Sequence, residues 1–581
     1  MEKKTLLERA GEYLDQETDP TFASEVRKLL EADDEKELED RFYRDLEFGT
    51  GGLRGVIGGG FNRMNTLVVT KATQGLCDYL GEQFPGKSLS ACIAYDSRRR
   101  SKDFATATAL VFAANGIKAY LFPSLRPTPE LSFAIRRLGA DTGVVVTASH
   151  NPPQYNGYKA YWNDGSQVVP PHDLGIIDKV QAVRNVKTMD EKLAMERGLL
   201  VILDSAVDDA YVAMVKSRLL RPELIMREAS SVKVVYTPLH GTGAMLFERI
   251  MGELGLKVLT VPEQREPDGE FPTVAFPNPE EPAALKLAIE LGAREDADVV
   301  MATDPDADRL GIAVPDKEGR FVLVTGNQLG ALHLDYILSS LKELGRMPPR
   351  PACIKSIVTT DFQRAIAAKY GVECRECLTG FKWIAEVMRV LEREGKDFVY
   401  ATEESYGHLI ETEVRDKDGI SAAALTAEMA LYWRSRGLGL LDRLEELYSE
   451  FGYYEEKGIS KYFQGPSGMQ IMSGIMDEYR RSQPIAIGGI PVVGLRDIKT
   501  GEEWETGSSE RRQVDLPESD VLQWRLRDGT LVTVRPSGTE PKIKYYVLCR
   551  TDSGISGTET ARRQTRDKIA AIEADIRKVL G

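Results

Sequence analysis

Residues 90–153, SACIAYDSRRRSKDFATATALVFAANGIKAYLFPSLRPTPELSFAIRRLGADTGVVVTASHNPP, alternate short apolar segments with longer segments of helical periodicity. The apolar segments predict strands, at 90–95, 118–123 and 143–147. The segments between them predict helices, at 102–115 and 129–138. Strands separated by helices are typical of a mostly parallel sheet that helices cover. This stretch therefore predicts an α/β fold.

The same alternation occurs twice more along the chain. It restarts with predicted strands at 232–237, 257–261 and 299–303 and helices at 243–254 and 281–292. It restarts again with strands at 353–358 and 398–402 and helices at 326–343 and 361–370. We therefore predict three successive α/β domains with mixed, mostly parallel sheets and with boundaries near 205 and 320.

The two ends of the chain depart from this pattern. Residues 1–46 are charged and helical in pattern, and they lead to a glycine-rich loop at 49–55. Near the other end, Asp528-Gly529 separates two apolar segments and predicts a β-hairpin. A strand at 543–549, a helix at 558–579 and a surface loop at 500–512 complete a predicted α+β domain. Four domains result, at 1–205, 206–320, 321–450 and 451–581.

Composition limits the class of protein. The chain has 581 residues, 42% of them hydrophobic, and a formal net charge of −14, which argues against a nucleic-acid-binding protein. No apolar segment approaches the length of a membrane span, and the N-terminus has the pattern of a surface helix rather than of a signal peptide. Six cysteines predict reduced thiols, which are consistent with a cytoplasmic protein.

Ser149 stands where a predicted strand leaves the core, in Thr147-Ala148-Ser149-His150-Asn151-Pro152-Pro153. The two prolines fix the backbone and prevent a helix from starting at once. A hydroxyl held in this way suits a nucleophile or a phosphoryl carrier. Taken alone, such a segment is more often an ordinary turn.

Three aspartates follow the predicted strand 299–303, in Asp304-Pro305-Asp306-Ala307-Asp308-Arg309. Carboxylates at the carboxyl end of a parallel strand are typical of a ligand site, and their oxygens suit Mg²⁺. A calcium EF-hand does not fit, because Arg309 and Pro315 occupy its glycine and glutamate positions. The spacing therefore predicts a magnesium site.

Other segments suggest anion or sugar binding. Residues 535–544, RPSGTEPKIK, combine an arginine, hydroxyls, a glycine and lysines, which favours phosphate binding. Arg98 and Arg54 lie in two further basic loops. Glu403-Glu404-Ser405 follows another predicted strand and could hold sugar hydroxyls, while Lys159 is a candidate acid or base. The loops of Arg98 and Arg54 are equally consistent with ordinary loops. Surface acidic pairs like Glu403-Glu404 are common, and a lysine like Lys159 is more often simply exposed.

Motifs that are missing narrow the function further. The sequence contains neither a G-x-x-x-x-G-K-[ST] loop nor a G-x-G-x-x-G fingerprint, so nucleotide-dependent chemistry is not indicated. No G-x-S-x-G elbow surrounds Ser149, which argues against a serine hydrolase. A serine, a metal site and a phosphate loop together suggest phosphoryl transfer between the protein and a phosphorylated metabolite.

Four motifs in this order resemble those of the α-D-phosphohexomutase family, in particular its long phosphoglucomutase/phosphopentomutase branch. The resemblance runs from about Phe48 to about Arg550, through TASHNPPQYNGYK at 147–159, DPDADR at 304–309, EESYG at 403–407 and RPSGTEPK at 535–542. It implies three related α/β domains and a smaller fourth around a central cleft, which hold in turn the phosphoserine, the metal, the sugar and the phosphate. The N-terminal 45 residues match no motif.

The resemblance also implies roles for individual residues. Ser149 would carry the phosphoryl group and, with Asp304, Asp306 and Asp308, bind one Mg²⁺ per chain. Lys159 and Arg54 would be catalytic. Substrate would contact Arg98, His150, Arg309, Lys382, Glu403, Ser405, Arg535, Ser537, Gly538 and Thr539. His408 receives no role, because Tyr406 alters the spacing seen in shorter phosphomannomutase-type members.

We accordingly expect a phosphoglucomutase that interconverts glucose 1-phosphate and glucose 6-phosphate through a bisphosphorylated sugar, with glucose 1,6-bisphosphate as activator. A phosphopentomutase or a glucose-1,6-bisphosphate synthase on the same scaffold remains an alternative. A non-catalytic phosphosugar-binding protein is the alternative from another class. The expected partner is a small phosphosugar, with no nucleic acid or membrane, and the chain is expected to be a monomer or a homodimer.

Overall fold

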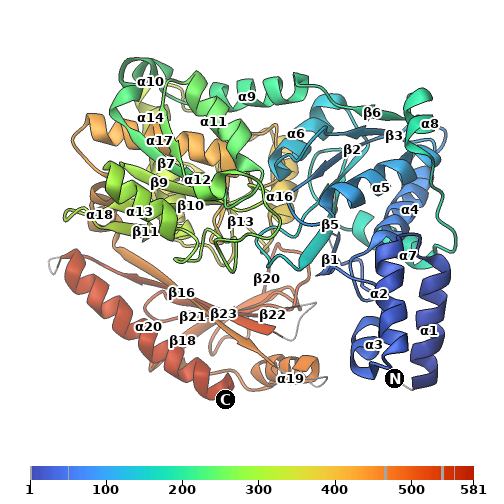
Figure 1. The fold of residues 1–581 in the computed structure, drawn as a ribbon. Coiled ribbons are helices and arrows are strands. Elements are labelled where there is room, and N and C mark those ends of the chain that lie inside the picture. Colours follow the sequence, from blue (N-terminus) through green and yellow to red (C-terminus); the bar gives the residue numbers. More distant parts are fainter. Residues whose placement is uncertain (1–2, 50–51, 464–467, 538–541, 555–556, 581) are drawn as a thin grey trace. The chain divides into compact units, whose positions relative to one another are not determined.

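A computed structural model describes residues 3–49, 52–463, 468–537, 542–554 and 557–580 (Figure 1). The chain divides into two compact units. The first comprises residues 1–324 and 406–432, and the second comprises residues 325–405 and 433–581. Among the described residues, no helix combines the length and apolarity needed to cross a bilayer. All six cysteines are free, which agrees with the prediction of reduced thiols.

Three helices open the first unit, α1 (Lys3–Gln16), α2 (Pro20–Glu31) and α3 (Glu35–Phe42). Local sequence explains where α2 starts, since the Asp19 side chain accepts a hydrogen bond from the Thr21 N–H and Pro20 occupies the first helical position. The helices contribute to a small apolar core that includes Tyr13 and Phe42 together with Phe61 and Leu67 from the chain that follows them. The prediction of a helical N-terminus is confirmed.

The first sheet has six strands in the order β1 (Gly52–Val56), β5 (Tyr155–Trp162), β4 (Thr142–Val146), β2 (Ser90–Tyr95), β3 (Lys118–Leu121) and β6 (Leu200–Ile202). Parallel pairing joins β4, β2, β3 and β6, whereas β5 is antiparallel to both of its neighbours. Helices α4 (Thr66–Gln83), α5 (Ser101–Ala114) and α6 (Thr128–Leu138) connect these strands. The β-α-β alternation predicted for residues 90–147 is therefore confirmed.

The expectation that residues 49–55 form a loop is wrong from Gly52 onward, because β1 starts there. Glycines allow β1, β5 and the serine segment to approach closely. A Cβ atom on Gly52 would lie 1.8 Å from the Tyr158 carbonyl oxygen, and one on Gly157 would lie 2.4 Å from the Thr147 carbonyl oxygen. The glycines that suggested a loop thus serve a close strand contact.

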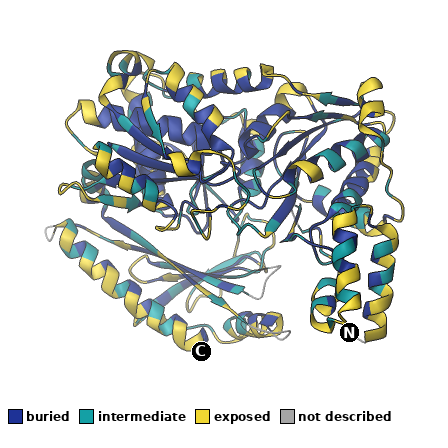
Figure 2. Ribbon diagram, in the orientation of Figure 1, coloured by how far each residue is buried: buried dark blue, intermediate teal, exposed yellow. Residues whose placement is uncertain are grey.

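The second sheet has the order β11 (Phe321–Val324), β10 (Leu310–Pro315), β9 (Val299–Thr303), β7 (Lys233–Thr237) and β8 (Lys257–Thr260). Strand β9 is buried along its whole length (Figure 2). Helices α11 (Gly243–Glu253) and α13 (Lys286–Glu295) belong to the same domain. The helix predicted at 281–292 starts only at Lys286, because successive turns at Glu281 and Ala284 precede it.

The second unit begins with parallel strands in the order β13 (Glu373–Cys377), β12 (Pro351–Ser356) and β14 (Asp397–Glu403). Helices α14 (Gly326–Glu343), α15 (Phe362–Lys369) and α16 (Phe381–Arg393) accompany them. This arrangement confirms the third predicted α/β alternation.

A largely antiparallel sheet follows, with the order β16 (Tyr453–Tyr462), β23 (Lys542–Thr551), β22 (Leu531–Pro536), β21 (Leu522–Leu526), β18 (Ile490–Asp497), β19 (Glu502–Glu505) and β20 (Arg512–Gln513). The predicted Asp-Gly hairpin is confirmed by the antiparallel pairing of β21 with β22. The surface loop predicted at 500–512 is wrong, because Glu502 and Glu503 pair across to Gln513 and Arg512. The paired residues of these two strands are polar, so a prediction based on apolar residues does not detect this edge of the sheet.

The described residues also form the following elements. They are α7 (His172–Ala182), α8 (Glu191–Glu196), α9 (Ala206–Arg218), α10 (Pro222–Glu228), α12 (Pro262–Arg265), β15 (Gly407–Leu409), α17 (Gly419–Ser435), α18 (Leu440–Phe451), α19 (Gly468–Arg481), β17 (Ala486–Ile487) and α20 (Thr558–Leu580). The terminal helix predicted at 558–579 corresponds to α20.

Candidate functional site

Ser149 lies three residues beyond the end of β4 and has a left-handed backbone, with a φ of 51°. Its N–H donates to the Thr147 hydroxyl oxygen at 2.8 Å, and that hydroxyl donates to Asp96 at 2.6 Å. A non-glycine residue with positive φ costs about 1–3 kcal/mol and persists only where its surroundings hold it. The loop therefore fixes the serine in a conformation that it would not adopt alone.

Arg98 also holds this loop, which comprises residues 147–154 between β4 and β5 and is called the serine loop. Its guanidinium donates to the carbonyl oxygens of Pro152 at 2.9 Å and Tyr155 at 3.1 Å, and also to those of Ser149 and Asn151. Arg98 is 3% exposed and forms an ion pair with the buried Asp96. The donors of Arg98 thus lie on the serine loop, and its predicted contact with substrate stays a prediction.

The three aspartates of the second sheet meet this loop. Asp304, Asp306 and Asp308 follow β9, are buried, and offer oxygens that all lie within 4.8 Å of one another. The Ser149 hydroxyl donates to Asp304 Oδ2 at 2.7 Å. Two motifs separated by more than 150 residues are thus brought together within the first unit.

Two lysines balance part of the aspartate charge. Lys159 Nζ lies 2.8 Å from Asp306 Oδ2, and Lys417 Nζ lies 3.1 Å from Asp308 Oδ2. Burial lowers the pKa of Lys159, but the carboxylates of Asp306 and Asp308 outweigh burial and raise it, so this lysine is protonated. Sequence analysis missed Lys417; its only signal was the charged triplet Asp416-Lys417-Asp418 ahead of a helix.

The donor set fits a hard divalent cation. Oδ1 of Asp306 and Oδ1 of Asp308 are buried without a hydrogen-bond partner. Burial raises the pKa of Asp304 well above its ordinary value, and the neighbouring Asp306 and Asp308 raise it further. Burial also acts to raise the pKa of Asp306, but Lys159 reverses the effect and lowers it. Crowded carboxylate oxygens with free acceptor capacity are the ligands that Mg²⁺ prefers.

The first domain also holds the aspartate loop directly. Thr128, at the start of α6, donates its backbone N–H to the carbonyl oxygen of Asp306 and its hydroxyl to the carboxylate, each at 2.9 Å. Opposite the loop, a Cβ on Gly241 would lie 2.3 Å from Pro305 Cα. The aspartates are therefore oriented from both domains.

Other predicted residues surround the serine. His150 Nδ1 lies 3.1 Å from Ser149 Oγ. Burial lowers the pKa of His150 well below its ordinary value, and Arg309 and Arg54 lower it further, so the imidazole is neutral. Arg309 pairs with Glu280 at 2.7 Å, and Arg54 donates to the Asn151 side chain at 3.4 Å. Both arginines thus lie beside the serine loop.

The predicted sugar residues belong to the second unit. Glu403 ends β14 and accepts a hydrogen bond from the Gly380 N–H at 2.6 Å. Lys382 follows Gly380 by two residues, and its Nζ lies 5.2 Å from the centre of the Trp383 ring. Ser405 follows Glu403 by two positions. The segment before α16 and the end of β14 are therefore neighbours.

The predicted phosphate residues continue from β22. Arg535 pairs in register with Lys544 of β23, and the Ser537 N–H donates to the Lys542 carbonyl oxygen at 2.8 Å. Gly538 and Thr539 lie outside the described residues.

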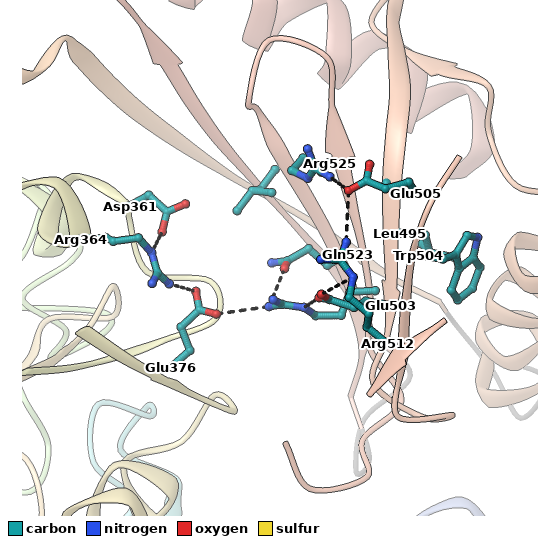
Figure 3. A pocket seen from close by; sticks show the side chains of 13 residues that line it. Asp361, Arg364, Glu376, Leu495, Glu503, Trp504, Glu505, Arg512, Gln523 and Arg525 are labelled. Carbon is teal, nitrogen blue, oxygen red and sulfur yellow. Dashed lines mark hydrogen bonds and ion pairs between the residues drawn. The ribbon is translucent and has the colours of Figure 1, made fainter. Parts of the chain in front are cut away.

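A separate cavity of about 350 Å³ occurs in the second unit, between α15, β13 and the antiparallel sheet (Figure 3). Charged side chains line it and pair with one another, for example Arg364 with Glu376 at 2.7 Å and Arg496 with Glu503 at 3.1 Å. No predicted site residue lines this cavity.

Comparisons with known proteins agree with this arrangement. Models of the α/β/α domains I, II and III of phosphoglucomutase/phosphomannomutase match residues 45–187, 209–319 and 325–451. A phosphopentomutase from Pongo abelii is 35% identical over 94% of this chain and 92% of its own length. A phosphoglucomutase from Staphylococcus epidermidis is 36% identical over 89% of this chain and 93% of its own length.

A solved structure shares the fold. The open form of pp63/parafusin, a phosphoglucomutase from Paramecium, matches with a TM-score of 0.66 and 17% identity. The match covers 91% of this chain and 95% of that one.

Proposed function

The chain belongs to the phosphoglucomutase/phosphomannomutase family of phosphomutases, and from this premise we propose that it interconverts glucose 1-phosphate and glucose 6-phosphate. Ser149 carries the transferred phosphoryl group in this proposal. The observation that supports it best is the 2.7 Å hydrogen bond from Ser149 Oγ to a buried aspartate of the metal-binding triplet. A hydroxyl in that position suits a phosphoryl group bound next to a cation.

Each site residue has its own role in the proposed phosphoryl transfer. Asp304, Asp306 and Asp308 would hold one Mg²⁺, which when bound withdraws charge from the transferring phosphoryl group. Ser149 Oγ gives its phosphoryl group to the free hydroxyl of the sugar phosphate and later receives the other phosphate of the bisphosphorylated sugar. Lys159, protonated beside Asp306, holds a proton for this exchange, and Arg98 keeps the loop carbonyls in place.

Substrate residues complete the proposal. His150, Arg309 and Arg54 would contact the reacting phosphate, and the neutral imidazole of His150 can accept or donate a hydrogen bond. Glu403, Ser405 and Lys382 would bind the sugar. Arg535, Ser537, Gly538 and Thr539 would bind the phosphate that does not react.

A pentose phosphate is the second candidate substrate, because relatives about as similar as the phosphoglucomutase are named phosphopentomutase and phosphoribomutase. The same serine and aspartate triplet would serve either sugar. The difference between the two candidates therefore concerns the sugar residues and not the phosphoryl transfer.

The test is a coupled assay of glucose 1-phosphate with catalytic glucose 1,6-bisphosphate, run beside ribose 1-phosphate. We expect turnover of glucose 1-phosphate at the higher kcat/KM, and the reverse order would favour the second candidate. Intact-mass measurement should find one phosphoryl group on the wild-type chain and none on Ser149→Ala. Full turnover by Ser149→Ala would overturn the proposal.

A further inference from the structure

The three successive arginines at 98–100 have three different anchors. Arg98 donates to carbonyl oxygens of the serine loop. Arg99 pairs with Glu270 in the second domain. Arg100 pairs with Asp19, which belongs to the N-terminal helices. A segment of three residues therefore joins the N-terminal helices to the serine loop.

Further contacts hold both partners of the Asp19–Arg100 ion pair in place. Glu17 accepts a hydrogen bond from the Asp19 N–H at 2.8 Å, and the Asp19 carboxylate caps α2 through the Thr21 N–H at 2.9 Å. Arg100 lies over the Phe22 ring, with 5.0 Å between the guanidinium carbon and the ring centre. It has a left-handed backbone with a φ of 65° at the start of α5. Asp19 at the N-cap of α2 and Phe22 within it thus help to stabilise Arg100, which also pairs with Asp103 at 3.2 Å, in a conformation that a non-glycine residue rarely adopts.

A second contact runs through the segment that follows β1. The Gly59 N–H donates to Glu25 of α2 at 2.9 Å, and Arg41 of α3 donates to the Gly59 carbonyl oxygen at 3.1 Å. Next to that segment, the Ile57 N–H donates to the Gln154 carbonyl oxygen at 2.8 Å, inside the serine loop. The N-terminal helices therefore contact the loop's two supports, which lie at 57–60 and at 98–100.

We propose that the N-terminal helices α1–α3 position the phosphate-carrying serine loop, and that Asp19 and Glu25 are the positioning residues. Neither residue touches Ser149, so both act through Arg100 and Gly59. The kinetic part of this proposal rests on the proposed function, whereas the structural part does not. It gives the N-terminal 45 residues, which match no sequence motif, a role in the reaction.

The test compares Asp19→Ala with Asp33→Ala in the full-length protein. Asp33 is an exposed control, because it forms a 2.7 Å ion pair with Lys3 of α1 and, among the described residues, has no hydrogen bond or ion pair with the serine loop. Hydrogen exchange should rise by about tenfold in peptides from 147–157 of Asp19→Ala, and stay unchanged in Asp33→Ala. Displacement of the serine should lower kcat by about tenfold with little change in KM.

Equal exchange at 147–157 in both variants would overturn the proposal, as would a loss of thermal stability with unaltered kcat. If Asp19→Ala does not fold, Asp19→Asn replaces it, because asparagine keeps the acceptor for the Thr21 N–H and removes the charge that holds Arg100. The exchange measurement needs no substrate. It therefore decides the positioning role even if the phosphoserine assignment fails.

Discussion

Lys417 provides the sharpest test of the charge balance at the site. It is 7% exposed, and its Nζ lies 3.1 Å from Asp308 Oδ2 and 3.2 Å from Asp416 Oδ1. At an effective dielectric constant of 20, one such pair corresponds to about 5 kcal/mol of Coulomb energy. Part of this offsets desolvation, so removal of one partner of a buried pair costs about 3–5 kcal/mol of unfolding free energy. Lys417→Met shortens the side chain by one atom, keeps most of its apolar stem, and removes the positive charge together with its N–H donors.

We expect Lys417→Met to lower the melting temperature of the metal-free protein by about 4–7 °C, because an unfolding entropy of about 2.1 cal/mol/K per residue gives about 1.4 °C per kcal/mol for the first unit, which has about 350 residues. Mg²⁺ should then restore more stability to the variant than it adds to the wild type, since the cation replaces the missing positive charge. Differential scanning fluorimetry with EDTA and with Mg²⁺ measures both quantities. Lys216→Met is the control, because Lys216 forms an exposed 2.7 Å pair with Glu253 that is worth about 1 kcal/mol or less. Equal losses in the two variants, or an equal response to Mg²⁺, would refute this account.

Three further predictions concern the serine loop and the buried His408. Gly157→Ala should lower the free energy of unfolding by about 1–3 kcal/mol and displace the serine loop, because the new Cβ would lie 2.4 Å from the Thr147 carbonyl oxygen. Gly81→Ala is the control, since a Cβ there would have nothing within 4 Å. Urea unfolding of the two variants measures the difference. Thr147→Val should reduce kcat by about a hundredfold, because the Ser149 N–H loses its hydrogen-bond acceptor. Steady-state kinetics measures this, and a change in KM with an unchanged kcat would contradict the prediction. Burial lowers the pKa of His408 to about 3, so the stability contributed by its neutral ring is present above about pH 6.5 and is lost as the pH falls toward 3, by about 3 kcal/mol at pH 4.5. The melting temperature of His408→Leu should therefore depend less on pH between pH 6.5 and 4.5 than that of the wild type. An unchanged dependence would contradict the lowered pKa of His408.

The parts of the fold that the sequence predicted are those set by local pattern. Strands β2, β4 and β9 are buried on both faces, so each is an unbroken apolar run that needs no knowledge of its neighbours. Strand β5 mixes polar and aromatic residues after two prolines, and it pairs with β1 through Gly52 and Gly157. That pairing depends on a contact between distant segments, which periodicity does not report.

The same limit applies to the site. Residue types identified Ser149 and the aspartate triplet, and the fold places them in contact. Charge alone could not predict that Arg98 contacts the serine loop, because a guanidinium can bind a phosphate or backbone carbonyls equally well. Lys417 escaped notice because only the folded chain brings it to Asp308.

The wide separation of the site residues also sets an order of events during synthesis on the ribosome. Chains emerge from the N-terminus, so the positioning helices and the serine loop leave the exit tunnel before the aspartate triplet exists. Of the two lysines that pair with the triplet, Lys417 emerges last, more than a hundred residues after Asp308. A nascent chain at that stage carries three crowded carboxylates with Lys159 as their main partner, and a dissolved divalent cation is then the nearest substitute for the missing lysine.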